Sequence, residues 1–304
     1  MSAGTRTPSV QYSSSVFKRQ TEGSVLCTSC GVLVGVNDAT CDSCGRRNPG
    51  LWGFAPVFRR LGNDLGFVTL VMGATITLYV LSLLLSGAGL QTMLAPSSRV
   101  LLLLGASGSY PVFVMERWWT VLTAGWLHAG VLHILFNVMW IRQLGPGVAD
   151  LYGAGRMVII YTVAGAMGFL FTSLAGQFLS GSPLAAVPIL GRLIGGAQLS
   201  VGASASIFGL LGALVYYGRR TGSRHVGDAG LQYALMMGLF GLIMPGVDNQ
   251  AHLGGFVGGY LAGQLLDPLK PERIDHMVAA VACLVITAAA LVASVVTALP
   301  LLMR

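Results

Sequence analysis

The sequence predicts an all-α fold, a polytopic bundle of membrane-spanning helices preceded by a small four-cysteine module. Of the 304 residues, 54% are hydrophobic and only 10% are charged, against about 25% charged in ordinary soluble domains. The apolar residues gather into long stretches between Leu65 and Leu302. About 20 apolar residues are enough for a helix to cross the hydrocarbon layer. These stretches predict the bundle, and the cysteines near the N-terminus predict the module.

The chain divides into five predicted segments. Residues 1–24 are rich in Ser and Thr and are expected to form a disordered tail. Residues 25–48 hold four cysteines, and residues 49–64 mix aromatic and basic side chains that suit a linker at the lipid interface. Residues 65–268 form the main membrane domain, and residues 269–304 add a C-terminal transmembrane helix.

Seven transmembrane helices are expected, and each lacks the polar face that a soluble helix of this length needs. They are placed at residues 66–90, 129–147, 155–177, 200–218, 230–246, 249–267 and 277–300. The long connections at about 91–127 and 179–199 contain several Gly and Pro residues. We expect both connections to be non-helical.

The net charge of +7 predicts topology and not a nucleic-acid partner. With a cytoplasmic N-terminus, the other side of the membrane receives four of the 18 basic residues, namely Arg99, Arg117, Arg192 and Arg304. The remaining fourteen lie on the cytoplasmic side, as the positive-inside rule requires. We therefore expect a multi-pass protein of the cell membrane that contacts anionic lipid.

The four N-terminal cysteines form two C-x2-C pairs, Cys27 with Cys30 and Cys41 with Cys44, and a glycine follows each pair. Two such pairs can hold one zinc ion in a tetrahedral four-thiolate site. Two disulfides are the alternative, which a reducing cytoplasm disfavours. The module resembles a zinc ribbon, so we expect structural Zn²⁺, no catalytic cofactor, and a binding partner of unknown identity.

Polar residues within the membrane helices gather where three of the helices begin, and such residues are functional candidates because their burial in lipid is costly. His133 and Asn137 lie one turn apart on the second helix, Ser204 opens the fourth, and His252 opens the sixth. A serine hydroxyl needs a base to become a nucleophile. His252 is the one histidine outside the second helix that lies near a helix start on the same side. The start of a helix also leaves backbone N–H groups free to stabilise a negative charge.

Each candidate has a structural alternative. Ser206 is a rival nucleophile if the motif is shifted by two residues. His252 on its own is compatible with a buried histidine bonded to a carbonyl, and Asn137 with a contact between helices. Asp248 is expected to cap a helix, and His276, beside Asp275, is expected to be solvated.

Small residues on the fourth and sixth helices predict that these helices pack closely, since small side chains let backbones approach in lipid. A direct Ser–His hydrogen bond requires such an approach. The residues concerned are Ala205, Gly209, Gly212 and Ala213 on one helix and Gly255, Gly258, Gly259, Ala262 and Gly263 on the other.

The segments HAGVLHILFN, GASASIFGLLGA and AHLGGFVGG resemble, in this order, the three signature regions of rhomboid proteases. The resemblance covers about residues 66–268. It implies that Ser204 is the nucleophile of a Ser–His dyad with His252, and that Asn137 and His133 belong to the oxyanion hole. It also implies that His128 lies near the mouth of the active site. The implied fold is a six-helix core around a water-filled cavity, to which a seventh span is appended.

Two residues depart from the family pattern. Ala205 stands where the second glycine of GxSG is usual, and Thr120 stands where the arginine of a Trp-Arg pair is usual. Since alanine is small, we expect activity to survive the first change. The second concerns how the first loop is anchored.

These features together predict an intramembrane serine endopeptidase that cleaves transmembrane segments of other membrane proteins. An unwound substrate segment has to reach Ser204, which favours substrates with Gly or Pro in the helix. The alternative is an inactive rhomboid-like protein that binds clients for trafficking or quality control. A transporter ranks behind both, because the polar residues gather toward one side of the membrane.

Overall fold

The computed structural model describes residues 19–28, 30–60, 62–87, 89 and 94–302. Contacts divide the chain into two units, residues 1–61 and 62–304, and each unit is described by itself. Residues 1–18, which make up most of the predicted disordered tail, lie outside the described residues.

The N-terminal unit is built on two short antiparallel strands, β1 (Ser24–Leu26) and β2 (Leu33–Gly35). They are followed by the 3-10 helix η1 (Leu51–Gly53) and by α1 (Ala55–Arg60). Residues 51–60, expected within an interfacial linker, thus form helices, and α1 packs on β1. The small core of the unit consists of Val25, Cys27, Val34, Val36, Cys41 and Ala55.

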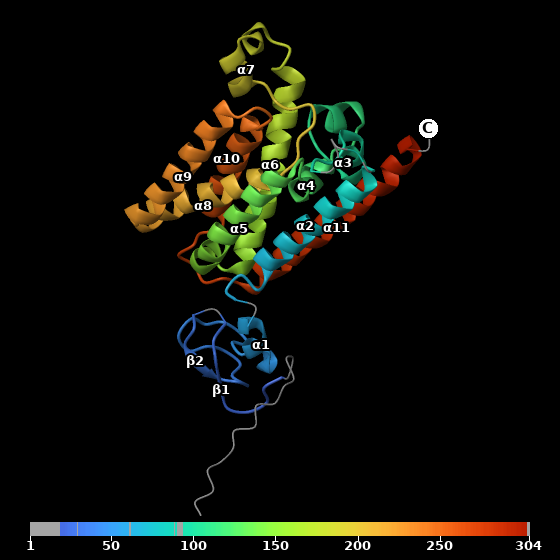
Figure 1. Ribbon diagram of the computed structural model, residues 1–304. Coiled ribbons are helices and arrows are strands. Elements are labelled where there is room, and N and C mark those ends of the chain that lie inside the picture. Colours follow the sequence, from blue (N-terminus) through green and yellow to red (C-terminus); the bar gives the residue numbers. More distant parts are fainter. Residues whose placement is uncertain (1–18, 29, 61, 88, 90–93, 303–304) are drawn as a thin grey trace, which may run out of the picture. The chain divides into compact units, whose positions relative to one another are not determined.

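The second unit is a helical bundle (Figure 1). Its described part contains seven helices of 17 residues or more. They are α2 (Phe67–Leu85), α5 (Val131–Tyr152), α6 (Ala154–Phe178), α8 (Ser204–Thr221), α9 (Arg224–Ile243), α10 (Asn249–Leu265) and α11 (Ile274–Leu302). Each corresponds to one of the predicted helices, with ends that differ by a few residues. The predicted all-α membrane bundle is confirmed.

The long connections contain short helices, so the prediction that they are non-helical was wrong. The first holds α3 (Ser98–Leu104), the π-helix η2 (Tyr110–Val114), α4 (Thr120–Thr123) and the 3-10 helix η3 (Ala124–Trp126). The second holds η4 (Pro183–Ala186) and α7 (Pro188–Ile194). Short apolar runs form a single turn or two of helix once a cap satisfies their ends. For α3 the cap is the Ser97 hydroxyl, which accepts a bond from the Val100 N–H at 3.3 Å.

Four of the described helices are long and apolar enough to cross a membrane: α2, α6, α9 and residues 274–300 of α11. A fifth span results if Thr120–Trp126 and Val131–Tyr152, which meet at 93°, are counted together. Helices α8 and α10 are not among them. The last turn of α8 carries Arg219 and Arg220, and α10 has only 17 residues.

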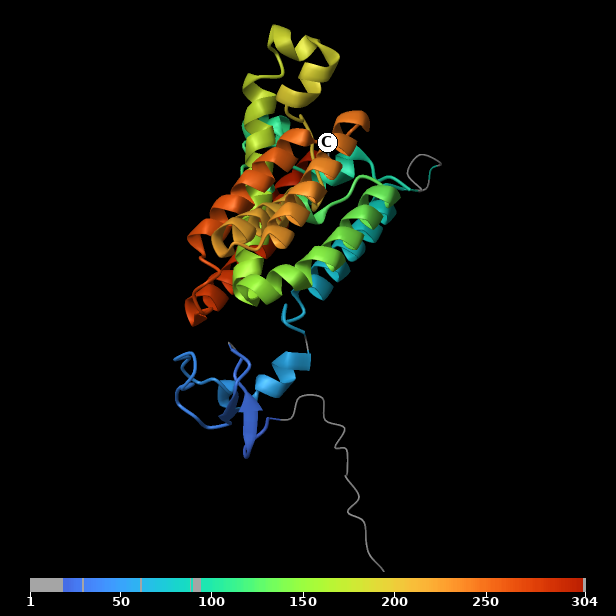
Figure 2. The same cartoon turned by 90° about the vertical axis from the view of Figure 1, so that its left-hand side faces the viewer.

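Helix α10 packs against both α8 and α6. The contact with α8 has no room for larger side chains. A Cβ atom on Gly259 would overlap the carbonyl oxygen of Gly209, and one on Gly212 would overlap that of Phe256. The predicted close approach of these two helices is therefore confirmed. On the periphery, α2 and α5 run next to each other (Figure 2).

The turn between α10 and α11 is bound to the start of α6 by Arg156, which is 1% exposed. Its guanidinium donates to the carbonyl oxygens of Asp267 (3.2 Å) and Pro271 (2.5 Å) and to Nδ1 of His276 (3.1 Å). The same Nδ1 accepts a bond from the Arg273 N–H at 3.1 Å. His276 is partly exposed and also belongs to this hydrogen-bonded network.

Candidate active site and metal centre

Ser204 and His252 lie within hydrogen-bonding distance of each other. The Oγ atom of Ser204 is 2.9 Å from Nε2 of His252. Ser204 is the first residue of α8, and His252 lies in the first turn of α10. His252 is buried, with 8% of its surface exposed, while Ser204 is half-buried. The contact follows from the tight α8–α10 packing, which brings the starts of both helices together.

The segment before Ser204 is held by Gly202. Its backbone has φ +129°, which favours glycine, and its N–H donates to the carbonyl of Ala124 at 2.9 Å. A Cβ atom at this position would come within 2.5 Å of Nε2 of His133. Gly202 therefore lets the histidine ring lie against the turn that leads into Ser204.

The imidazole of His252 is stacked on the ring of Phe208, with centroids 4.2 Å apart and planes 13° apart. Nδ1 of His252 is buried and has no hydrogen-bond partner in the described part of the chain. The ring is thus oriented by an aromatic face and not by a carboxylate. Sequence reasoning missed Phe208, although its position four residues after Ser204 puts both on the same face of α8.

His133 and Asn137 lie on the first two turns of α5. Nδ1 of His133 lies 3.5 Å from the Ala129 backbone nitrogen, and Nε2 is the ring nitrogen next to Gly202. Asn137 is buried, and its amide nitrogen donates to the His133 carbonyl at 2.8 Å. One N–H of that amide is left for another acceptor.

His128 lies in the bend between η3 and α5 and is 1% exposed. Its ring meets that of His133 edge to face, at 5.1 Å between centroids. Neither ring nitrogen has a partner among the described residues. His128, which was expected near the mouth of the active site, is therefore buried.

The rival serine points elsewhere. Ser206 is 3% exposed, and its Oγ lies where a side chain on Gly165 of α6 would be. Asp248 caps α10, as expected, by accepting a bond from the Ala251 N–H at 3.0 Å. It also accepts a bond from the Thr172 hydroxyl of α6 at 2.9 Å.

The two departures from the family pattern have local compensations. Ala205 is fully buried, and its methyl group fits because the facing residue on α6 is Gly168, where a Cβ atom would come within 2.7 Å of it. Thr120 is buried as well. Its hydroxyl donates to the Arg117 carbonyl at 2.7 Å and lies 3.2 Å from that of Ser107. The threonine thus anchors the first loop internally.

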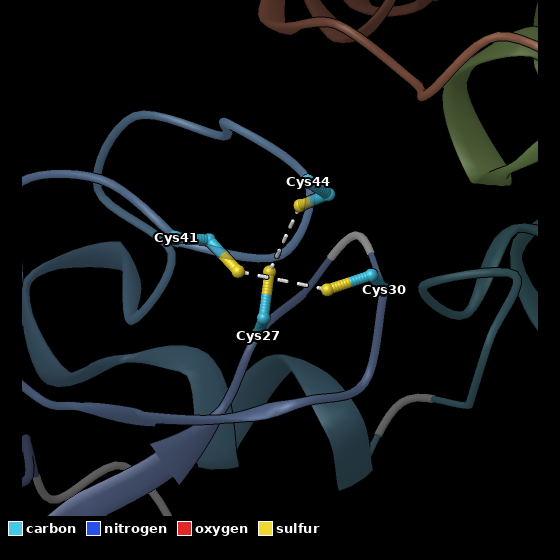
Figure 3. A group of neighbouring side chains, drawn as sticks. All are labelled: Cys27, Cys30, Cys41 and Cys44. Carbon is cyan, nitrogen blue, oxygen red and sulfur yellow. Dashed lines mark hydrogen bonds between the residues drawn. The ribbon is translucent and has the colours of Figure 1, made fainter.

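The four N-terminal cysteines converge on one point (Figure 3). Their sulfur atoms all lie within 4.8 Å of one another. Two of the pairs join the two halves of the motif, with Cys27 and Cys44 at 3.8 Å and Cys30 and Cys41 at 3.6 Å. Disulfide sulfurs are about 2.05 Å apart, so neither of these pairs is a disulfide. The alternative of two disulfides is not what the structure contains.

The cysteine geometry fits a tetrahedral metal ion. Zn–S bonds of about 2.3 Å place tetrahedral sulfurs about 3.8 Å apart. In each half a turn carries the pair, with Gly31 donating to the Cys27 carbonyl at 3.0 Å and Gly45 donating to that of Cys41 at 2.8 Å. The Val32 backbone N–H lowers the pKa of the Cys30 thiol to about 7, while burial raises the pKa of Cys44 to about 12. The cluster can hold a metal ion.

Comparison with known proteins identifies the second unit. Residues 115–268 match the model of the Rhomboid domain. The chain is 33% identical over 153 residues to the Rhomboid protease GluP of Bacillus subtilis. The aligned residues cover 49% of this chain and 26% of that protein. It is 35% identical over 178 residues to RHOMBOID-like protein 7 of Arabidopsis thaliana, covering 57% of this chain and 51% of that protein.

RHOMBOID-like protein 1 of the same plant is 33% identical over 175 residues, or 56% of this chain and 40% of that protein. The chain thus spans about half or less of the length of these relatives. The family match nevertheless extends over half of the chain and includes Ser204, His252, His133 and Asn137. This chain belongs to the rhomboid family.

Proposed function

We propose that this chain is an intramembrane serine endopeptidase in which Ser204 is the nucleophile and His252 the general base. The observation that carries the proposal is the 2.9 Å contact between Ser204 Oγ and His252 Nε2. This distance is what a base needs in order to take the hydroxyl proton. A protein that only binds clients has no need of such a pair at the ends of two tightly packed helices.

In the proposed reaction, Ser204 Oγ attacks the carbonyl carbon of the scissile peptide while its proton passes to Nε2 of His252. When the tetrahedral intermediate collapses, the same nitrogen gives the proton to the leaving amine. Water then hydrolyses the ester on Ser204 with His252 again as base. Stacking on Phe208 keeps the imidazole in one plane through these steps.

The oxyanion of the intermediate would be stabilised by donors around the start of α8. Nε2 of His133, next to Gly202, would donate one bond as the protonated ring nitrogen, and Asn137 would donate the amide N–H that its bond to the His133 carbonyl does not use. The backbone N–H groups of the first turn of α8 add to these, since the first N–H groups of a helix have no partner within it. Buried His128 supports the ring of His133.

The substrates would be transmembrane proteins that are cut within or beside a membrane helix. Because the dyad is built from the membrane bundle itself, a substrate segment has to unwind locally in order to present its peptide bond. Helices weakened by Gly or Pro meet this requirement at the lowest cost. We further propose a location in the cell membrane with the N-terminus in the cytoplasm, supported by the excess of basic residues on that side.

We also propose that the N-terminal cysteines bind one structural Zn²⁺ ion, supported by the four-sulfur geometry. Such a site uses all four ligand positions for protein, which leaves none for catalysis. The ion would stabilise a unit whose described residues contribute a core of six buried side chains. Its task would then be the binding of a partner by the folded module.

Active-site labelling tests the catalytic proposal. A fluorophosphonate probe applied to membranes that contain the chain should attach to Ser204, as mapped by mass spectrometry. The Ser204→Ala variant should not react, and the Ser206→Ala variant should. If the intact chain inserts but does not react with the probe, the enzyme proposal fails and the client-binding alternative gains support.

A further inference from the structure

The C-terminal span α11 contacts the membrane bundle at both of its ends. At its start, Arg156 binds the turn that precedes α11. Between the ends, an apolar cleft of about 270 Å³ separates Cys283 and Ile286 of α11 from α6. Most of the span is exposed along its sides. A second attachment lies nearer its C-terminal end, at Ser294.

That attachment is made by Arg117, in the loop between η2 and α4. Its side chain is 3% exposed. One terminal nitrogen donates to the Leu102 carbonyl of α3 at 2.7 Å, and the other donates to the Ser294 carbonyl of α11 at 2.6 Å. The planar fork of a guanidinium can bind two such oxygens at once, which a lysine ammonium on a flexible chain does less well. Trp119 adds a second link, from its indole nitrogen to the Ser294 hydroxyl at 3.2 Å.

The loop that Arg117 organises also contacts the segment before Ser204. The Arg117 carbonyl accepts the hydroxyl of Thr120, and that hydroxyl contacts Ser107. Ser107 and Ser200 exchange backbone hydrogen bonds of 3.1 and 2.7 Å. Continuous hydrogen bonds thus join Ser294 to Ser200, four residues before the nucleophile.

A second contact ends even closer to the nucleophile. Ala124, just after α4, accepts the Gly202 N–H at 2.9 Å. The loop is therefore bonded at two points to the segment that sets the direction of Ser204. A buried arginine is costly in a membrane domain unless it has a function or is well paired, and Arg117 is paired only with backbone oxygens among the described contacts.

We infer that Arg117 is a positioning residue that uses α11 to align the Ser204 segment for the proposed proteolysis. The inference rests on the proposed function but concerns a different part of the chain. A loop that is held only by short helices can shift, and a misplacement of about 1 Å costs about a hundredfold in rate. The bond to α11 restrains the loop from the outside of the bundle.

The test compares Arg117→Lys and Arg117→Gln with the full-length parent. Arg142→Lys, at an exposed position on α5, serves as the control. Fluorophosphonate labelling at saturation counts the competent Ser204 sites, and kcat and KM for a transmembrane reporter substrate are expressed per labelled site. We expect both Arg117 variants to lose about tenfold to a hundredfold in kcat per labelled site, with little change in KM. The control should match the parent.

A purely structural role gives a different result, because unfolding lowers the number of labelled sites and leaves kcat per site unchanged. That outcome would overturn the inference while the protease proposal stands. If both Arg117 variants fail to insert, Arg117 is needed for folding of the domain, and the inference of a positioning role is overturned. A parent that neither labels nor cleaves overturns the protease proposal and this inference with it.

Discussion

Phe208 and His252 lie face to face, with ring centroids 4.2 Å apart and planes 13° apart. In hydrolases with a catalytic triad, a carboxylate orients the histidine. Here the second ring nitrogen of His252 has no partner among the described residues. The aromatic ring therefore takes over the orienting role, and it comes from the helix that also carries Ser204.

Replacing Phe208 by Leu should lower kcat by about threefold to tenfold, because a well-placed aromatic pair is worth about 0.5–1.5 kcal/mol beyond its buried area. Phe208→Tyr keeps the ring and should stay near the parental rate. Turnover of a reporter substrate per labelled Ser204 measures both. Phe178→Leu, at an exposed position on α6, is the matched control. Equal turnover in Phe208→Leu and the parent would show that stacking does not orient the base.

Replacing Ser204 or His252 by Ala should abolish cleavage while the protein still inserts into membranes, since either change leaves no activated nucleophile. Ser206→Ala should retain cleavage because this hydroxyl lies against α6. Cleavage assays in reconstituted vesicles, with expression levels matched by immunoblot, check all three variants. An active Ser204→Ala variant together with an inactive Ser206→Ala variant would show that Ser206, and not Ser204, is the nucleophile.

Asn137→Ala should reduce kcat by about tenfold to a thousandfold, the range for the loss of one oxyanion donor in soluble hydrolases. His133 and the backbone N–H groups remain, which places the expected loss toward the lower part of that range. The variant also loses the bond from Asn137 to the His133 carbonyl, so its thermal stability has to be measured in parallel. A parental kcat at full expression would remove Asn137 from the site.

Changing Cys27 and Cys30 together to Ser should eliminate bound zinc, while cleavage of a simple substrate in detergent stays largely intact. Two of the four ligands are lost, and the proposed dyad lies in a different unit of the chain. Elemental analysis of the purified protein, expected to find one zinc per parent chain, is paired with the cleavage assay. Cys283→Ser should keep the metal, since this cysteine lies in α11 outside the cluster.

Two results would contradict the zinc prediction. A parent chain purified without chelators that contains no zinc would mean that the four thiols serve another purpose. Loss of cleavage together with the metal would mean that the two units are functionally coupled. In that case, chelation of the parent should reproduce the loss and added zinc should restore it.

Sequence reasoning located the long helices of the bundle because their signal is local. The length of an apolar run and the polar residues at its ends determine where a membrane helix begins and stops. The same reasoning placed the short helices α3 and α7 in non-helical connections, since runs of seven residues carry little periodic signal. It did not find the bond between Arg156 and His276, because no local pattern indicates that the side chain of Arg156 reaches this histidine from α6.

The sequence by itself determined which residue types are available for chemistry, the spacing that brings four cysteines to one ion, and the small residues that let α8 and α10 approach. Only the tertiary structure decided that Ser204 and not Ser206 faces His252, that Phe208 orients the imidazole, and that Arg117 binds α11. These relationships depend on how each helix is rotated about its axis and where it crosses its neighbours. Both are set by packing between segments far apart in the chain, which no local pattern of residues encodes.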